Sequence, residues 1–426
     1  MPIFFYHFAW TLLFLFCVPL IPLFRKKRFM ERLALDLPPD PPFEGSIWIH
    51  ALSVGEVISS LPLVNALGLQ YPDRDIVFSV TTSKGMSIAR RELQGKVSAL
   101  LTMPIDFWWS ARRMVDYVRP SLFVLVETDI WPALLDRLKK RGVDSILVNG
   151  RVSPRTFKAY RRFPLFARMM FDRPEFCLVQ SDLDRERLLN VGVDPDKVRR
   201  VGNIKFDREW VPMGEKERLE RSKLLGLGPE DQIWVAGSTH SGEDEILLEV
   251  FGRLRHGFTT LRLIIAPRRI ERSRNILEMA QDRGFRAALK TSLPENDGPH
   301  DVLILDTLGE LGRYYGIGSV SFVGGSLAPV GGHNLLEPAS FGCPVLFGPH
   351  THNFVVMSES LVEAGGGWRV SDGEGLFRAM KTLLTDPGVC LDMGEHARAF
   401  VEKNRGALER VVSYVDHCMK QHGGLG

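Results

Sequence analysis

The sequence predicts an α/β protein with two doubly wound, parallel-sheet domains and an N-terminal membrane-anchor helix. Three observations predict this: an uncharged apolar run opens the chain, short apolar β-rich runs alternate with helix-like stretches, and the alternation stops and restarts near the middle. Alternating strands and helices are typical of parallel sheets that helices cover on both faces. A length of 426 residues allows two or three domains of ordinary size.

The composition is that of a globular protein, with 45% hydrophobic and 25% charged residues, and it excludes disorder and coiled coil for the chain as a whole. The 54 basic and 51 acidic residues give a net charge of +3, so no nucleic-acid partner is expected. The five cysteines lie far apart and include no C-x-x-C pair, which predicts neither a disulfide framework nor a zinc ribbon. His350 and His352 lack further ligands at a zinc spacing, so we expect no metal site.

The anchor is expected within residues 1–28. Residues 3–24 contain no Asp, Glu, Lys or Arg, and a helix of that length matches a hydrocarbon core of about 30 Å. Four basic residues follow the run, whereas a cleaved signal peptide carries its charges before it, so we expect a retained anchor with the rest of the chain on the cytoplasmic side. Pro19 and Pro22 leave an alternative open, a kinked helix that lies in the membrane interface.

After a proline-rich spacer, two sets of strands define two domains. The first domain is expected over residues 37–207, with a crossing segment behind it, and the second over residues 213–426. In sheets of this kind, ligands bind beyond the carboxyl ends of the strands. The expected strands of the first domain are residues 47–52, 76–80, 122–126, 146–148 and 176–179, and those of the second are residues 233–236, 261–266, 302–305, 320–323 and 345–347.

Two carboxylates follow expected strands of the first domain. Glu56 stands at the start of the helix after the first strand, and Glu127 directly follows strand 122–126. A glutamate placed there faces the ligand crevice and can act as a general base if its surroundings tune its pKa. The alternatives stay open: Glu56 complements the helix dipole, or Thr128 or Asp129 caps the next helix and Glu127 is merely solvated.

Three loops of the second domain are typical of phosphate binding. Residues 236–242 and 324–338 are rich in glycine and small residues, and residues 266–269 carry two arginines. Glycine-rich loops at helix starts leave backbone N–H groups bare for a phosphate, and guanidinium groups suit its oxygens. The alternative is that the glycines make tight turns and the arginines stay solvated. The sequence lacks a P-loop and a complete dinucleotide fingerprint, which excludes the common NTPase and NAD-dependent classes.

A basic, aromatic stretch spans residues 151–173. Its basic side chains outnumber its one acid, Asp172, and five aromatic residues are interleaved with them. Beside an anchor, such a stretch favours anionic lipid headgroups. A solvated helix face with a core stripe and an RNA-binding surface remain as alternatives.

Taken together, the motifs resemble the Kdo transferases of glycosyltransferase family 30. The resemblance runs from the anchor to about Phe354. It is carried by residues 53–56 (SVGE), 127–132 (ETDIWP), 149–151 (NGR), 202–207 (GNIKFD), 266–268 (APR) and 331–338 (GGHNLLEP). It implies a GT-B fold, in which two Rossmann-like domains flank an interdomain cleft, with the acceptor on the N-terminal domain and the CMP-sugar on the C-terminal one.

The resemblance further implies transfer of 3-deoxy-D-manno-oct-2-ulosonic acid (Kdo) from CMP-Kdo to a lipid A precursor, lipid IVA, in lipopolysaccharide synthesis at the cytoplasmic face of the inner membrane. It implies no cofactor and no metal in the chemistry. Two rivals stay open: another GT-B enzyme with a UDP donor, and a non-catalytic membrane-surface protein that binds anionic lipid.

The resemblance also assigns site residues. Glu56 matches the family's general base, and Glu127 and Lys205 match groups assigned to transition-state stabilisation. Leu335 stands where relatives often have proline. The positions that match the CMP-binding residues are Pro267, Arg268, Leu308, Gly309, Glu310, Asn334, Leu335, Leu336 and Glu337.

Overall fold

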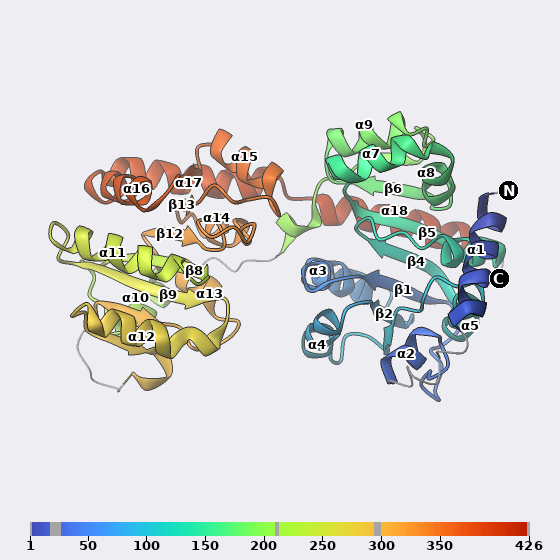
Figure 1. Cartoon of the computed structure of the whole chain (residues 1–426), viewed down its shortest axis with the longest axis horizontal. Helices are drawn as coiled ribbons and strands as arrows, with labels where there is room; N and C mark the ends of the chain where they lie inside the picture. The colour runs from blue at the N-terminus through green and yellow to red at the C-terminus, as the bar shows by residue number, and fades with distance from the viewer. Residues whose placement is uncertain (1, 18–26, 209–212, 294–299, 424–426) are drawn as a thin grey trace. The chain divides into compact units, whose positions relative to one another are not determined.

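The computed structural model describes residues 2–17, 27–208, 213–293 and 300–423. The chain forms two compact units (Figure 1). Unit 1 comprises Met1–Glu209 and Asn404–Gly426, and unit 2 comprises Trp210–Lys403.

Unit 1 is built on a seven-stranded parallel sheet in the order β3-β2-β1-β4-β5-β6-β7. The chain runs outward from β1 to β3, then returns to place β4 beside β1, so the direction of winding reverses between these two strands. Ligands of doubly wound sheets bind at such a switch point. The strands are β1 (Ser46–Ala51), β2 (Ile76–Val80), β3 (Ala99–Thr102), β4 (Pro120–Val126), β5 (Asp144–Gly150), β6 (Phe176–Val179) and β7 (Val198–Arg200).

Helices cover both faces of this sheet because successive side chains of each strand point to opposite sides. Trp48 and Phe123 are buried in a core with α5, α6, α8 and α9, whereas Ile47 and Ile49 are buried in a second core with α3, α4 and α18. The helices of unit 1 are α1 (Pro2–Cys17), α2 (Lys27–Arg32), α3 (Val54–Gln70), α4 (Ser83–Glu92), α5 (Trp108–Val118), α6 (Pro132–Lys140), α7 (Pro154–Arg162), α8 (Pro164–Phe171), α9 (Asp182–Asn190), the 3-10 turn η2 (Ile204–Asp207) and α18 (Ala407–Gly423).

The last helix, α18, departs from the expected domain bounds. The sequence-based bounds place residues 213–426 in the second domain, but Asn404–Gly426 belongs to unit 1. The physical reason is that the apolar stripe of α18, which includes Val411 and Val415, is buried in the core beside α3. Asp207 also holds the start of the helix, because its carboxylate accepts hydrogen bonds from the backbone N–H groups of Gly406 (2.5 Å) and Leu408 (2.8 Å).

The described part of the expected anchor comprises residues 27–28, at the start of α2, and helix α1, which packs on the rest of unit 1. The Tyr6 hydroxyl donates a hydrogen bond to Asp106 (2.7 Å), and the rings of Phe14 and Phe107 stack with their centroids 4.8 Å apart. Among the residues that the structure describes, no helix is both long enough and apolar enough to cross a membrane. The remainder of the expected anchor, residues 18–26, lies outside the described residues.

Unit 2 is built on a second seven-stranded parallel sheet, in the order β10-β11-β9-β8-β12-β13-β14, with its switch point between β8 and β12. Its strands are β8 (Gln232–Thr239), β9 (Leu261–Pro267), β10 (Ala287–Leu289), β11 (Val302–Ile304), β12 (Val320–Val323), β13 (Val345–Phe347) and β14 (Gly367–Arg369). Its helices are α10 (Glu215–Leu224), α11 (Glu243–Arg255), α12 (Ser273–Asp282), α13 (Leu311–Tyr315), α14 (Leu336–Ser340), α15 (Val355–Glu363), α16 (Gly373–Thr385) and α17 (Pro387–Lys403), with 3-10 turns η3 (Ile270–Arg272) and η4 (Lys290–Ser292).

Candidate active site

Glu56 lies in the first turn of α3, directly after β1, and only 7% of its surface is exposed. Its carboxylate accepts hydrogen bonds from the Leu52 backbone N–H (2.6 Å) and the Ser53 hydroxyl (3.1 Å). Burial, followed by the negative charge of Glu127, raises the pKa of Glu56 to about 7. A carboxylate with that pKa can accept a proton near neutral pH, which is the tuning that a general base requires.

Glu127 follows β4 with its backbone in the left-handed region, at φ 61°. This conformation costs a non-glycine residue about 1–3 kcal/mol, and such strain clusters at functional sites. Its carboxylate forms an ion pair with the Lys205 ammonium, with 2.8 Å between Oε1 and Nζ. Because Glu56 follows β1 and Glu127 follows β4, the two carboxylates flank the switch point of unit 1.

The capping alternative for the Glu127 region is wrong. Helix α6 begins after Trp131 with no side-chain cap from its own segment. Instead, Asp106 from a neighbouring loop accepts hydrogen bonds from the backbone N–H groups of Ala133 and Leu134, both 2.9 Å long. Glu127 itself is half-buried and forms an ion pair with Lys205, so it is not merely solvated.

A network of side-chain amides positions Lys205. The Asn203 side-chain oxygen accepts a hydrogen bond from the Lys205 backbone N–H (3.0 Å), and the Asn203 amide donates one to Gln180 (3.0 Å). Gln180 in turn donates to the backbone oxygen of buried Asn149 (2.9 Å), whose side chain accepts a hydrogen bond from the Ile204 N–H (3.2 Å). The network joins Asn149 near the end of β5, Gln180 after β6 and Asn203 after β7 to the turn that carries Lys205. Sequence reasoning missed Gln180, which stands in no recognised motif.

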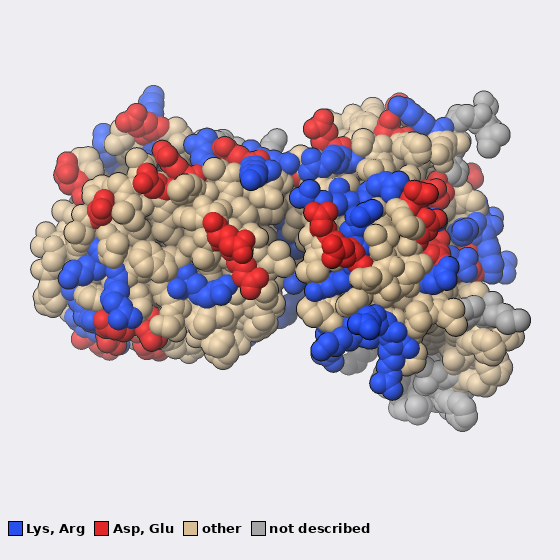
Figure 2. All heavy atoms as spheres, turned by 90° about the horizontal axis from the view of Figure 1, so that it is seen from above, with Lys and Arg blue, Asp and Glu red and all other residues tan. Residues whose placement is uncertain are grey.

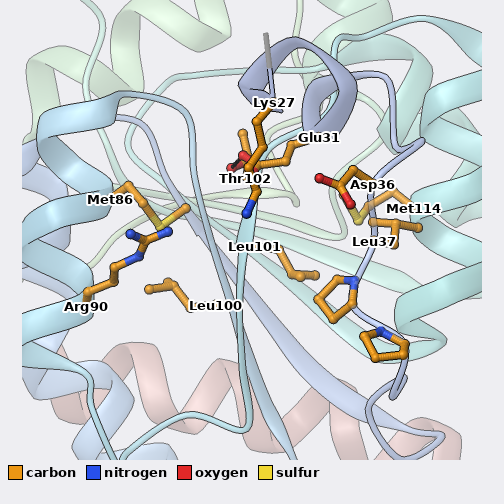
Figure 3. Close-up of a pocket in the computed structure, with 12 residues that line it drawn as sticks. Lys27, Glu31, Asp36, Leu37, Met86, Arg90, Leu100, Leu101, Thr102 and Met114 are labelled. Carbon is orange, nitrogen blue, oxygen red and sulfur yellow. Dashed lines mark hydrogen bonds between the residues drawn. The ribbon is translucent and has the colours of Figure 1, made fainter. Parts of the chain in front are cut away.

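A cavity elsewhere in unit 1 contains none of the expected site residues. Its volume is about 240 Å³, and its walls come from α2, the 36–39 loop, α4, β3 and Met114 of α5 (Figure 3). Lys27 and Arg90 extend over an apolar floor, and the Thr102 hydroxyl donates a hydrogen bond to Glu31 (2.8 Å). The candidate site is therefore not this cavity, but the open carboxyl edge at β1 and β4.

In unit 2, the ends of β8, β9 and β12 bring together three loops that were expected to bind phosphate. The Arg268 backbone N–H donates to the Thr239 oxygen (3.0 Å), which ties the end of β9 to that of β8. Pro267 is buried at the end of β9, and the Arg268 side chain is exposed beyond it. Arg268 also lies close enough to His333 that its charge, after burial, lowers the pKa of that imidazole.

The expectation of bare N–H groups in the glycine-rich loop after β12 is wrong for its first half. These N–H groups donate hydrogen bonds to the carboxylate of Glu243, a residue that is fully buried. It accepts hydrogen bonds from the backbone N–H groups of His240 (2.9 Å), Gly325 (2.7 Å), Ser326 (3.0 Å), Leu327 (2.9 Å) and Ala328 (3.2 Å). Sequence reasoning placed Glu243 in the first turn of a helix but missed this role, because Glu243 is the first residue of α11 and stands in no capping box.

The remaining expected nucleotide-binding residues lie in two turns. In the first turn, Gly309 has φ 86° and follows Leu308, whose side chain is exposed. The Glu310 carboxylate accepts hydrogen bonds from Lys290 and Thr307. In the second turn, the Asn334 side chain accepts a hydrogen bond from the Leu336 N–H (3.2 Å), and Glu337 is half-buried in the first turn of α14. The side chains of Leu335 and Leu336 are buried, so these two residues can offer a ligand only their backbone.

The basic, aromatic stretch forms α7 and α8, with a core stripe and an exposed basic face. Phe157 and Tyr160 pack against the core, as a core stripe would. Phe163 is 61% exposed, next to the exposed Arg161 and Arg162. Figure 2, viewed from the side of α7 to α9, shows basic side chains gathered on this face of unit 1 with acidic ones among them.

Comparisons with known proteins agree with this architecture. A family model described as 3-deoxy-D-manno-octulosonic-acid transferase (kdotransferase) matches residues 27–208. The 3-deoxy-D-manno-octulosonic acid transferase of Haemophilus influenzae is 33% identical over 435 residues, covering 98% of this chain and 100% of that protein.

Two solved structures share the fold. A UDP-GlcNAc 2-epimerase from Neisseria meningitidis bound to UDP-GlcNAc has a TM-score of 0.60 at 13% identity, covering 87% of this chain and 99% of that one. A glycosyltransferase from Rickettsia africae has a TM-score of 0.57 at 12% identity, covering 88% and 100%. The two parallel-sheet units thus resemble GT-B glycosyltransferases. Because the relative from Haemophilus influenzae matches over nearly the full length of both chains, this chain belongs to the 3-deoxy-D-manno-octulosonic acid (Kdo) transferase family of glycosyltransferases.

Proposed function

We propose that the chain is an inverting glycosyltransferase that moves Kdo from CMP-Kdo to a lipid A precursor, lipid IVA, in lipopolysaccharide synthesis. The observation that carries the proposal is the environment of Glu56. A buried carboxyl with a pKa of about 7 stands at the switch point of unit 1 with the Glu127–Lys205 pair, in a chain whose relative is named a Kdo transferase.

In this mechanism Glu56 accepts the proton of an acceptor hydroxyl while that oxygen attacks the anomeric carbon of Kdo. The bond between this carbon and the phosphate oxygen breaks, CMP leaves, and the single displacement inverts the configuration. Positive charge develops on the sugar, and the Glu127 carboxylate, held by Lys205 at 2.8 Å, stabilises it electrostatically.

Unit 2 binds the donor in this proposal. Arg268, whose guanidinium is exposed beyond β9, neutralises the leaving phosphate. Glu337 accepts hydrogen bonds from the ribose hydroxyls, and the turns at residues 308–310 and 334–336 line the nucleotide. Since Arg268 supplies the positive charge on the phosphate, the proposed chemistry involves no metal and no cofactor.

The proposal places unit 1 on the cytoplasmic face of the inner membrane, with α1 lying in the interface. The side chains of Phe4, Phe5 and Phe8 on α1 are 67%, 65% and 55% exposed. Helix α1 lies beside α8, because the ring centroids of Tyr6 on α1 and Phe166 on α8 are 6.3 Å apart. Exposed aromatic side chains beside arginines are typical of helices that lie at anionic lipid surfaces.

The donor is tested by competition between nucleotides. Purified, detergent-solubilised protein is titrated with CMP and with UDP, and the donor-dependent reaction is followed in the presence of each. We expect CMP to bind and to inhibit at concentrations where UDP does neither. Stronger binding of UDP would contradict the CMP-Kdo donor and favour the rival GT-B activity, while binding of neither nucleotide would favour the non-catalytic lipid-binding rival.

A further inference from the structure

Two histidines that the proposed mechanism does not use meet at the carboxyl edge of unit 2. His240 follows β8, and His333 lies in the loop between β12 and α14. Their Nε2 atoms are 2.8 Å apart, and the nearly parallel rings have centroids separated by 5.1 Å. Two nitrogens at this distance share one hydrogen, so one imidazole donates and the other accepts.

The surrounding backbone holds the two rings in place. One carboxylate oxygen of Glu243 accepts hydrogen bonds from both the His240 N–H (2.9 Å) and the Gly325 N–H (2.7 Å), which links the loops that carry the two histidines. Gly325 has φ 68°, and a Cβ atom there would lie 3.1 Å from His333 Cδ2 and 3.4 Å from His240 Cδ2. The histidines therefore pack on a position that suits only glycine.

The hydrogen bond fixes what the pair can offer a ligand. In the neutral pair, the accepting ring carries its proton on Nδ1, and the donating ring has a lone pair on Nδ1. One added proton converts both Nδ1 atoms into donors. Within the described part of the chain, neither Nδ1 atom has a hydrogen-bond partner, and neither is fully buried.

Burial, together with the positive charges around the pair, favours its neutral form. Burial, followed by the charges of Arg268 and His240, lowers the pKa of His333 to about 4. Burial also lowers the pKa of His240, where Glu243 opposes the shift and Arg272, Arg268 and Arg269 add to it. A bound phosphate brings negative charge and acceptor oxygens, both of which favour the protonated pair.

We propose that His240 and His333 act as one unit that contacts the leaving phosphate of the nucleotide donor and takes up one proton when that phosphate binds. The inference rests on the proposed function, in which unit 2 binds CMP-Kdo. The protonated pair then donates hydrogen bonds to the phosphate oxygens. As the bond between the sugar carbon and the phosphate oxygen breaks, these donors stabilise the negative charge that develops on CMP.

The test is calorimetric titration of the full-length protein with CMP at pH 7 in two buffers of different ionisation enthalpy, which counts the protons exchanged. Wild type should take up a proton on binding CMP and none on binding cytidine. The pKa of the CMP phosphate itself is about 6, so an arginine beside it drives proton release, and uptake must come from the protein. In His333→Gln, this uptake should disappear and CMP affinity should fall about tenfold.

His240→Gln repeats the test through the other ring, in case one variant fails to fold. His256→Gln is the matched control and should behave as wild type. His256 is exposed and directly follows the last residue of α11, whereas Glu243 is the first residue of that helix. CMP binding with equal proton uptake in wild type and both pair variants would overturn the inference and leave the proposed function standing. If wild type binds no CMP, the proposed function fails and this inference fails with it.

Discussion

At the scale of single residues, the two glutamates at the switch point of unit 1 differ in their surroundings, which give them different electrostatic properties. Glu56 is buried, and its pKa is raised to about 7, whereas Glu127 forms an ion pair with the ammonium of Lys205. The sequence predicted that both follow strands, because an apolar run leads into each. It did not predict the burial of Glu56, which depends on packing across the chain, and it linked Glu127 to Lys205 only through family resemblance.

The coupling between these carboxylates predicts a shift in the pH profile. Glu56 must be ionised to accept a proton, so kcat/KM should rise as the pH increases through about 7. Glu127→Gln removes a negative charge that raises the pKa of Glu56, so the acid limb should move to lower pH while kcat falls. The pH dependence of kcat/KM measures this, with Glu44→Gln, at an 80% exposed side chain, as control. An acid limb that stays in place would contradict the coupling.

Arg268 should discriminate between a nucleotide and its nucleoside. Arg268→Ala should weaken CMP binding about 10- to 100-fold, the loss expected of a charge-assisted hydrogen bond, and should leave weak binding of cytidine unchanged. Titration calorimetry with both ligands measures the difference. Arg274→Ala, which removes another exposed arginine from α12, serves as the control. Equal affinity of the Arg268 variant and wild type for CMP would refute the phosphate contact.

At the scale of elements, the ten strands predicted from the sequence are present, and the four that were missed are the edge strands. β3, β7, β10 and β14 stand at the ends of the two sheets. A central parallel strand is covered on both faces and reads as a continuous apolar run, which stands out in the sequence. The edge strands have three or four residues with partly exposed side chains, so their sequences carry little of that signal.

The return of α18 to unit 1 was also beyond prediction, since its partner Asp207 lies about 200 positions away in the sequence. Asp207→Ala removes the carboxylate that holds the first turn of α18, and it should destabilise unit 1 by about 1–2 kcal/mol. Thermal unfolding measures the loss. Asp196→Ala, at a side chain that is 95% exposed, is the control and should leave the unfolding temperature unchanged. An unchanged unfolding temperature in both variants would show that α18 is held by its apolar face alone.

At the scale of the whole molecule, the chain uses two seven-stranded parallel sheets, each with a switch point, for opposite chemistry. The switch point of unit 1 presents Glu56 and Glu127, and the corresponding edge of unit 2 presents Arg268 and the histidine pair. The sequence predicted this division because carboxylates and basic or glycine-rich loops followed different strands. It did not predict Glu243, which takes up the loop N–H groups that were expected to be bare.

The proposed membrane attachment through α1 predicts a loss of liposome binding that does not depend on unfolding. Replacing exposed Phe4, Phe5 and Phe8 with serine should reduce binding to anionic liposomes and retain the contact between Tyr6 and Asp106 that packs α1 on unit 1. Cosedimentation with liposomes measures binding. Leu69→Ser, at a leucine that is 85% exposed on α3, is the matched control. Equal binding by the triple variant and wild type would remove α1 from the proposed interface.

The central claim is that this chain transfers Kdo with Glu56 as the base. The most direct measurement gives purified protein CMP-Kdo with and without the tetra-acylated lipid A precursor, then follows CMP release and the mass of the lipid. We predict release that depends on the acceptor, a lipid heavier by whole Kdo units, and a loss of about 10²- to 10⁴-fold in Glu56→Gln. Unmodified lipid from folded wild type would contradict the assigned transfer, and full turnover by Glu56→Gln would contradict the assigned base.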